Sequence, residues 1–156
     1  MWVIAVMAGP RACILGVGVD IVHLPRVAAA ARRWGVRFER RILGPGELDA
    51  LQRLRGEPGG AAGGAAGAAG EAASARFLAS RWAAKEAAYK ALGAGPGPRV
   101  QFPDLQVERG TGGRPELRLV GTARRRMQEL GADQAHLSIS HDHEYAIAHV
   151  IIERTV

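Results

Sequence analysis

The chain has 156 residues, a length that fits one domain, and its 47% apolar and 23% charged residues exclude a wholly disordered chain. The single cysteine, Cys13, excludes an internal disulfide framework and favours an intracellular protein, cytoplasmic or in the mitochondrial matrix. The net charge of +6 indicates an anionic partner, although a codon bias toward Arg produces the same excess. No apolar run approaches the roughly 20 residues that span a bilayer, so no membrane contact is expected.

Residues 1–13 are interpreted as an N-terminal extension, and residues 14–156 as one domain. Inside this domain, residues 56–73 contain the low-complexity run GGAAGGAAGAAGEAA, which offers nothing large to bury. We therefore expect a flexible loop over residues 56–73.

The first predicted element is a strand over residues 14–22. Valine and isoleucine side chains alternate there with Gly16, Gly18 and Asp20, so one face is apolar and the other is nearly empty. Glycines in a strand mark the close approach of a ligand or of backbone. One interpretation is that the empty face leaves room for a metal ion or phosphate in front of the Asp20 carboxylate. The alternative is an ordinary acid at the end of a strand.

A helix is expected to begin near Pro25 and to end near Gly35, since proline suits the first turn and glycine the position after the last. Arg26 and Arg33 lie seven residues apart and hence on one face of it. Six arginines against one acid, Glu39, fall between residues 26 and 41. A short helix follows over residues 47–54.

A long helix is predicted from Ser74, a good N-cap, to Leu92, before Gly93. It is apolar almost all round, which is typical of a helix at the centre of a domain. The last third of the chain predicts two hairpins with a helix between them. Their segments are residues 100–108 with 116–120, the helix 122–130, and residues 135–141 with 145–153.

The long helix carries Glu86 and Lys90 one turn apart among small side chains. They are either an ordinary surface ion pair or a carboxylate and an ammonium group that serve a metal ion and a phosphate. The third candidate site is Ser138-Ile-Ser140-His141. It is a polar hairpin tip, a weak metal site with His143, or a set of phosphate-binding groups.

Three motifs occur together in this order: G-x-G-x-D in residues 16–20, W-x-x-K-E-x-x-x-K in residues 82–90, and S-x-S-H in residues 138–141. With this combination the chain resembles the holo-acyl carrier protein synthases, the small 4'-phosphopantetheinyl transferases, from about residue 14 to residue 152. The resemblance implies an α+β fold in which an antiparallel sheet packs around the long central helix.

The resemblance also implies an activity: transfer of the 4'-phosphopantetheine arm of coenzyme A to a serine of an apo acyl carrier protein. Adenosine 3',5'-bisphosphate is the leaving group and the reaction depends on magnesium. It implies that Glu86, Lys90 and His141 are catalytic and that Asp20 and Glu86 bind Mg²⁺. The general base stays open between Glu86 and water on the metal. The carrier, from fatty acid biosynthesis or another lipid or polyketide pathway, also stays open.

Further residues gain expected roles from the same resemblance. Coenzyme A would contact Arg81, Lys90, Gly93, Gly95, Ser140 and His141. Arg26, joined by Arg33 on the same helix face, would bind the acidic carrier protein. The small members of the family form homotrimers with active sites between subunits. The competing hypothesis is a basic nucleic-acid-binding module, which the few aromatic residues and the lack of a recognition motif disfavour.

Overall fold

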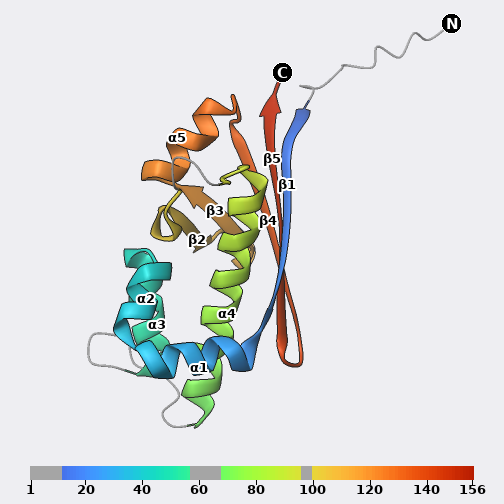
Figure 1. Ribbon diagram of the computed structural model, residues 1–156. Coiled ribbons are helices and arrows are strands. Elements are labelled where there is room, and N and C mark those ends of the chain that lie inside the picture. Colours follow the sequence, from blue (N-terminus) through green and yellow to red (C-terminus); the bar gives the residue numbers. More distant parts are fainter. Residues whose placement is uncertain (1–11, 57–67, 96–99) are drawn as a thin grey trace, which may run out of the picture.

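The computed structural model describes residues 12–56, 68–95 and 100–156. One long helix, α4 (Ala68–Ala91), runs through the middle of the molecule and separates a sheet from a group of shorter helices (Figure 1). The sheet has the order β1-β5-β4, with β1 (Ala12–His23), β5 (Tyr145–Thr155) and β4 (Gln134–Asp142) all antiparallel to their neighbours. The predicted α+β class, with an antiparallel sheet against a central helix, is therefore confirmed.

Strand β1 packs directly on α4 because two of its residues have no side chain. A Cβ atom on Gly16 would overlap the carbonyl oxygen of Ala91, and one on Gly18 would overlap that of Ala87. The alternation in the sequence thus marks the close approach of backbone. The valine and isoleucine side chains of β1 lie on the opposite face of the sheet, where more than half of each is exposed: Val17, Val19 and Ile21.

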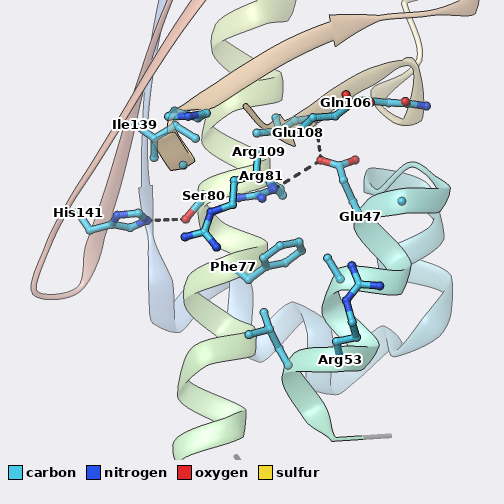
Figure 2. A pocket seen from close by; sticks show the side chains of 16 residues that line it. Glu47, Arg53, Phe77, Ser80, Arg81, Gln106, Glu108, Arg109, Ile139 and His141 are labelled. Atoms are coloured by element: carbon cyan, nitrogen blue, oxygen red, sulfur yellow. Dashed lines mark hydrogen bonds and ion pairs between the residues drawn. The ribbon is translucent and has the colours of Figure 1, made fainter. Parts of the chain in front are cut away.

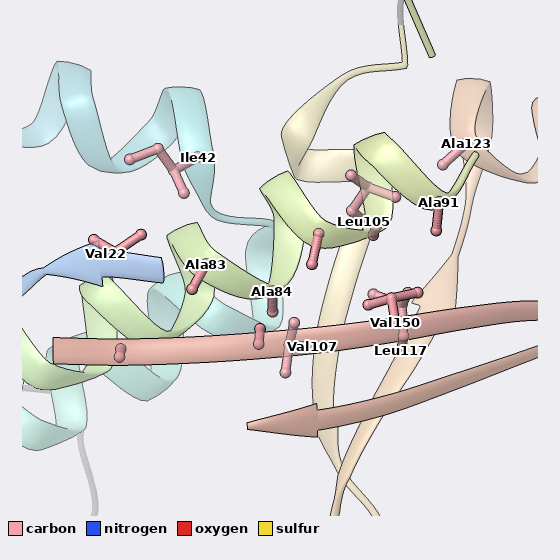
Figure 3. Close-up of a cluster of buried hydrophobic side chains, with 14 of the residues drawn as sticks. Val22, Ile42, Ala83, Ala84, Ala91, Leu105, Val107, Leu117, Ala123 and Val150 are labelled. Carbon is pink, nitrogen blue, oxygen red and sulfur yellow. The ribbon is translucent and has the colours of Figure 1, made fainter. Parts of the chain in front are cut away.

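Helix α4 is small and apolar where it meets the sheet. Ala83, Ala84, Ala87 and Ala88 are completely buried, and they allow the helix to approach both β1 and β5. Larger side chains complete the core, among them Val22, Ile42, Leu105 and Val150 (Figure 3).

Three helices cover one end of α4: α1 (Leu24–Trp34), α2 (Val36–Ile42) and α3 (Pro45–Arg55). The second hairpin, β2 (Leu105–Arg109) with β3 (Pro115–Leu119), lies beside α4 and β4, and α5 (Gly121–Glu129) follows it. Short 3-10 helices occur at Phe102–Asp104 and Thr111–Gly113. In the described part of the chain, no helix has the length and apolar character required to cross a membrane.

The predicted elements are confirmed in type and order, with two corrections. Helix α2 has no counterpart among the predicted elements. The loop predicted over residues 56–73 is wrong at its C-terminal end, because α4 begins at Ala68 and not at Ser74; residues 57–67 lie outside the described residues. Alanine favours helix strongly enough to tolerate the single glycine, Gly70, in this stretch. The proposed extension over residues 1–13 overlaps β1 at residues 12 and 13, and its remainder is not described.

Candidate active site

The first group of functional side chains lies along the seam between β1 and α4. The backbone contact at Gly16 and Gly18 brings Asp20 to the C-terminal half of α4. Lys90 donates one hydrogen bond to Asp20 Oδ1, with Nζ at 2.8 Å, and another to the carbonyl oxygen of Val19 at 3.0 Å. Lys90 is therefore paired across the seam with Asp20, and no ion pair with Glu86 is found among the described residues.

Glu86 lies half-buried in the same seam. Burial raises the pKa of the Glu86 carboxyl above its usual value, and the negative charge of Asp20 raises it further. Lys90 and Arg26 act in the opposite direction. Two carboxylates and two cations thus act on one another here, and α1 supplies Arg26 to the group.

The two carboxylates fit a magnesium ion. In the described part of the chain, no group of three or more His, Cys, Asp or Glu side chains is arranged around a common metal position. This argues against a cage built by protein ligands alone. Mg²⁺ commonly uses one or two carboxylates together with water and phosphate oxygens. Asp20 and Glu86 repel each other, and this repulsion raises the pKa of Glu86. A bound cation would relieve the repulsion.

The idea of an open space in front of the glycine face is wrong. The backbone of α4 fills that face opposite Gly16 and Gly18, since only residues without a side chain let the helix approach so closely. Any ligand of Asp20 must therefore approach from the edge of the seam.

The second group lines a pocket of about 940 Å³ on another side of α4 (Figure 2). Most of its lining residues come from α3, α4, β2 and β4. Arginines from three different elements line it: Arg53 of α3, Arg81 of α4 and Arg109 of β2. Such a concentration of guanidinium groups around one cavity favours an anionic ligand.

His141 reaches this pocket from β4 and meets Ser80 of α4 (Figure 2). The Ser80 hydroxyl donates its hydrogen to the carbonyl oxygen of Arg76 at 2.6 Å, so it accepts a hydrogen bond from His141 Nε2. This assigns the proton of the neutral ring to Nε2 and leaves Nδ1 as an acceptor. Burial lowers the pKa of His141, as do the positive charges of Arg76 and Arg81.

The other predicted residues lie at the surface or beyond the end of α4. Ser140 is exposed on the outer face of the sheet, because side chains alternate along β4 and His141 faces inward. Gly93 and Gly95 follow the C-terminal end of α4, with Gly93 in a left-handed conformation at φ 56°. Arg26 and Arg33 are both exposed on α1.

The structure therefore divides the predicted residues between two places. The seam holds Asp20, Glu86 and Lys90, whereas the pocket holds Arg81 and His141. Ser80 and Glu86 are six residues apart on α4, which corresponds to about 9 Å along the helix axis and about 120° around it. Strand β5 also separates β1, which carries Asp20, from β4, which carries His141.

Comparison with known proteins identifies relatives of this chain. Residues 16–150 match the model of the 4'-phosphopantetheinyl transferase superfamily. A holo-[acyl-carrier-protein] synthase from Halorhodospira halophila is 44% identical over 139 residues, which cover 89% of this chain and 97% of the relative. Another from Koribacter versatilis is 41% identical over 140 residues, 90% of this chain and 98% of the relative.

The chain belongs to this superfamily. Its fold agrees with that of a holo-(acyl-carrier-protein) synthase from Bacillus anthracis solved in complex with CoA (3',5'-ADP). The TM-score is 0.66 and the sequence identity 32%, covering 91% of this chain and 98% of the other. The resemblance inferred from the three sequence motifs is therefore confirmed, and the protein is a phosphopantetheinyl transferase.

Two residues that no sequence argument had assigned stand out in this transferase. Lys85 is completely buried, and its Nζ lies 2.6 Å from Glu47 Oε2 in an ion pair that joins α4 to α3. The signal for Lys85 was present in the sequence: a lysine within an otherwise apolar helix needs a buried partner. The identity of that partner, 38 residues away, was not visible in the sequence.

Proposed function

We propose that this transferase moves the 4'-phosphopantetheine arm of coenzyme A to a serine hydroxyl of an apo acyl carrier protein, with Mg²⁺ in the seam. One observation carries the proposal: two carboxylates and a lysine, Asp20, Glu86 and Lys90, converge where β1 meets α4. The match to holo-acyl carrier protein synthases over nine-tenths of the chain supports this reaction over a nucleic-acid-binding role.

The proposed reaction is one phosphoryl-type displacement. The serine oxygen forms a bond to the β-phosphorus of coenzyme A, and the bond from that phosphorus to the bridging oxygen breaks. Adenosine 3',5'-bisphosphate leaves with the bridging oxygen, and the serine proton passes to a base. This base is either Glu86 or water held by the magnesium ion.

Asp20 and Glu86 would hold the magnesium ion. When bound, Mg²⁺ would offset the negative charge of the pyrophosphate oxygens. Lys90 would release Asp20 and contact the pyrophosphate, since its side chain is half exposed and long enough to turn. Gly93 and Gly95, just beyond the end of α4, would approach the bound coenzyme closely.

The arginine-lined pocket would receive the nucleotide end of coenzyme A. Arg81, with Ser80 and His141 beside it, offers cationic and hydrogen-bonding groups to an anion, and the cavity has room for a nucleotide. A structure of the Bacillus anthracis relative is a complex with CoA (3',5'-ADP), which supports a nucleotide site in this fold.

The exposed surface of α1 and α2 would bind the carrier protein. Arg26 lies close enough to the seam to act on the pKa of Glu86. Arg32 of this surface pairs with Glu71, whereas five other arginines make no ion pair with any described residue: Arg26, Arg33, Arg37, Arg40 and Arg41. A positive surface next to the reacting groups would steer an acidic carrier toward them.

We also propose that the enzyme is a homotrimer whose active sites lie between subunits. The outer face of the sheet exposes Val17, Val19, Ile21 and Ile147, an apolar area on which another copy would pack. Because α4 separates the seam from the pocket within one chain, a complete site would combine the seam of one copy with the pocket of another.

The intact mass of an apo carrier protein tests the reaction. After incubation with the enzyme, coenzyme A and Mg²⁺, the carrier should gain one phosphopantetheine arm, and a chelator should prevent the gain. The absence of any gain with carriers from fatty acid and polyketide synthesis would refute the proposal.

A mixing experiment tests the shared site. Glu86→Gln removes a seam carboxylate and His141→Ala a pocket group, so each variant alone should be nearly inactive. If the sites lie between subunits, refolding the two variants together should restore part of the activity. No recovery in mixed oligomers, or a monomeric mass in sedimentation, would contradict a shared site.

A further inference from the structure

The carboxylate of Glu47 lies in the wall of the arginine-lined pocket and is 4% exposed (Figure 2). Its oxygens accept hydrogen bonds from the backbone N–H groups of Gly44 at 2.8 Å and Val107 at 3.2 Å. The Lys85 ammonium donates to it at 2.6 Å, and Arg81 Nε lies 3.7 Å away. One side chain of α3 thus meets two cations of α4 and the backbone of β2.

Glu47 is an unexpected residue for this place. A carboxylate in the wall of a pocket that takes an anion would repel the ligand unless its charge were balanced. The positive charge of Lys85 balances the Glu47 carboxylate. Lys85 is completely buried and donates a second hydrogen bond to the carbonyl oxygen of Phe102 at 3.0 Å. Burial lowers the pKa of Lys85, whereas Glu47 raises it through charge and hydrogen bonding.

Arg81 is held from several sides. Its guanidinium lies 4.2 Å from the centre of the Phe77 ring, which fixes the plane of the group. Its Nε is buried and makes no hydrogen bond within the described residues, so the nearby Glu47 carboxylate is the charge that compensates it. Burial lowers the pKa of Arg81, and the positive charge of Arg109 lowers it further. The negative charge of Glu47 raises it.

We propose that Glu47 is a positioning residue for coenzyme A binding: backed by Lys85, it holds the Arg81 guanidinium at the wall of the pocket in the orientation that meets the anionic nucleotide. This inference rests on the proposed function. It goes beyond that function by assigning a role to a pair of residues that does not touch the reacting atoms.

The competing explanation is that Glu47 and Lys85 only join α3, α4 and β2. That explanation predicts a loss of stability without a selective change toward coenzyme A. The chain offers a matched control, since Glu39 and Arg55 form another ion pair, with Arg55 Nη2 2.7 Å from Glu39 Oε1, that links α2 to α3 and does not line this pocket.

The experiment uses the full-length enzyme with both charges removed together, Glu47→Gln with Lys85→Met, so that the completely buried Lys85 is not left without its partner. The control is Glu39→Gln with Arg55→Met. We expect the first variant to weaken coenzyme A binding about tenfold, the size of effect associated with one charge-assisted contact. Its KM for coenzyme A should rise in parallel, while kcat and the KM for the carrier should change by less than about twofold.

Coupling to Arg81 gives a second readout that stability alone does not move. Arg81→Lys removes the Nε–H that faces Glu47 and should weaken coenzyme A binding in the wild-type background. In the Glu47→Gln, Lys85→Met background the same change should have less effect, because the guanidinium is no longer held. Circular dichroism and the thermal midpoint would establish that each variant is folded.

The inference is overturned if the folded double variant binds coenzyme A as the wild type does, or if its kinetic constants change together as in the control. It is also overturned if the effects of Arg81→Lys are equal in both backgrounds. These outcomes differ from failure of the proposed function, in which the wild-type enzyme itself neither binds coenzyme A nor modifies a carrier. If the double variant does not fold, Glu47→Asp with Lys85 intact gives the same test, since it keeps the charge and withdraws it from Arg81.

Discussion

The seam and the pocket lie on different faces of α4, and they balance charge in opposite ways. In the seam, the carboxylates of Asp20 and Glu86 repel each other, and the half-exposed Lys90 neutralises part of that charge. In the pocket, arginines from three elements line the wall, and two cations of α4, Lys85 and Arg81, lie beside the buried carboxylate of Glu47. The first arrangement suits a cation and the second suits an anion. Because α4 separates the two places within one chain, one coenzyme A molecule would meet the seam of one copy and the pocket of another.

The largest expected effect comes from Glu86→Gln, which removes one side of the seam. Turnover with saturating Mg²⁺ should fall by at least about 100-fold, the loss typical of a group that stabilises transition-state charge. The glutamine has the same shape, so the fold should persist. The matched control is Glu71→Gln, at an exposed residue of α4, the helix that also carries Glu86. It removes a carboxylate that pairs with Arg32 of α1 and should leave turnover nearly unchanged.

Stability as a function of pH gives an independent check on Glu86. Its folded pKa is raised, so the folded protein keeps a proton that the unfolded chain has already lost. The stability from this proton is present at low pH and is lost as pH rises through the raised pKa. Glu86→Gln should therefore gain in free energy of unfolding relative to wild type at pH 7, and this gain should shrink on acidification. A constant difference would contradict the raised pKa.

Gly18→Ala should disrupt the seam through packing and not through charge. The added methyl group would overlap the carbonyl oxygen of Ala87, so β1 and α4 must separate. We expect a loss of about 3 kcal/mol in the free energy of unfolding, measured in urea. Gly46→Ala is the control, since nothing lies within 4 Å of its Cβ and its backbone suits alanine. A stable Gly18→Ala variant would show that the close contact is not required.

Gly16 and Gly18 illustrate which features of the fold can be predicted from the sequence. The alternation of Gly16 and Gly18 with valines is local, so the strand and its two faces could be predicted. Whether a ligand or a helix fills the face at Gly16 and Gly18 depends on packing between distant segments, and here the backbone of α4 fills it. Helix α2 was not predicted because it has only seven residues, too few to show a period among its arginines.

The candidate site could be predicted from the sequence only in part. The motifs selected Asp20, Glu86 and Lys90, which the fold brings together. They did not reveal that Lys90 pairs with Asp20 across 70 residues, or that Glu47 meets Lys85. Such pairs form only when the tertiary structure brings distant segments together, and no local pattern encodes the partner.

Arg26→Ala should separate binding of the carrier from binding of coenzyme A. Arg26 is exposed on α1 and acts on Glu86, so its loss removes positive charge where the carrier would dock. The KM for the carrier should rise roughly tenfold at low salt, and less at high salt because surface charges are screened. The KM for coenzyme A should change little. Arg124→Ala, on the exposed side of α5, is the control. Equal changes in both constants would remove Arg26 from the carrier surface.

The smallest expected effect concerns His141 and shows whether the pocket is the anion site. Burial and the charges of Arg76 and Arg81 lower the pKa of this imidazole in the free enzyme. A phosphate bound beside it would offset those charges, so its pKa should rise when coenzyme A binds. Titration of the imidazole signals by NMR, with and without coenzyme A, measures the change. Arg81→Gln should reduce the rise because it weakens anion binding. An unchanged or lower pKa in the complex would place the phosphates elsewhere, and the seam would then have to bind both the metal ion and all of the anionic groups.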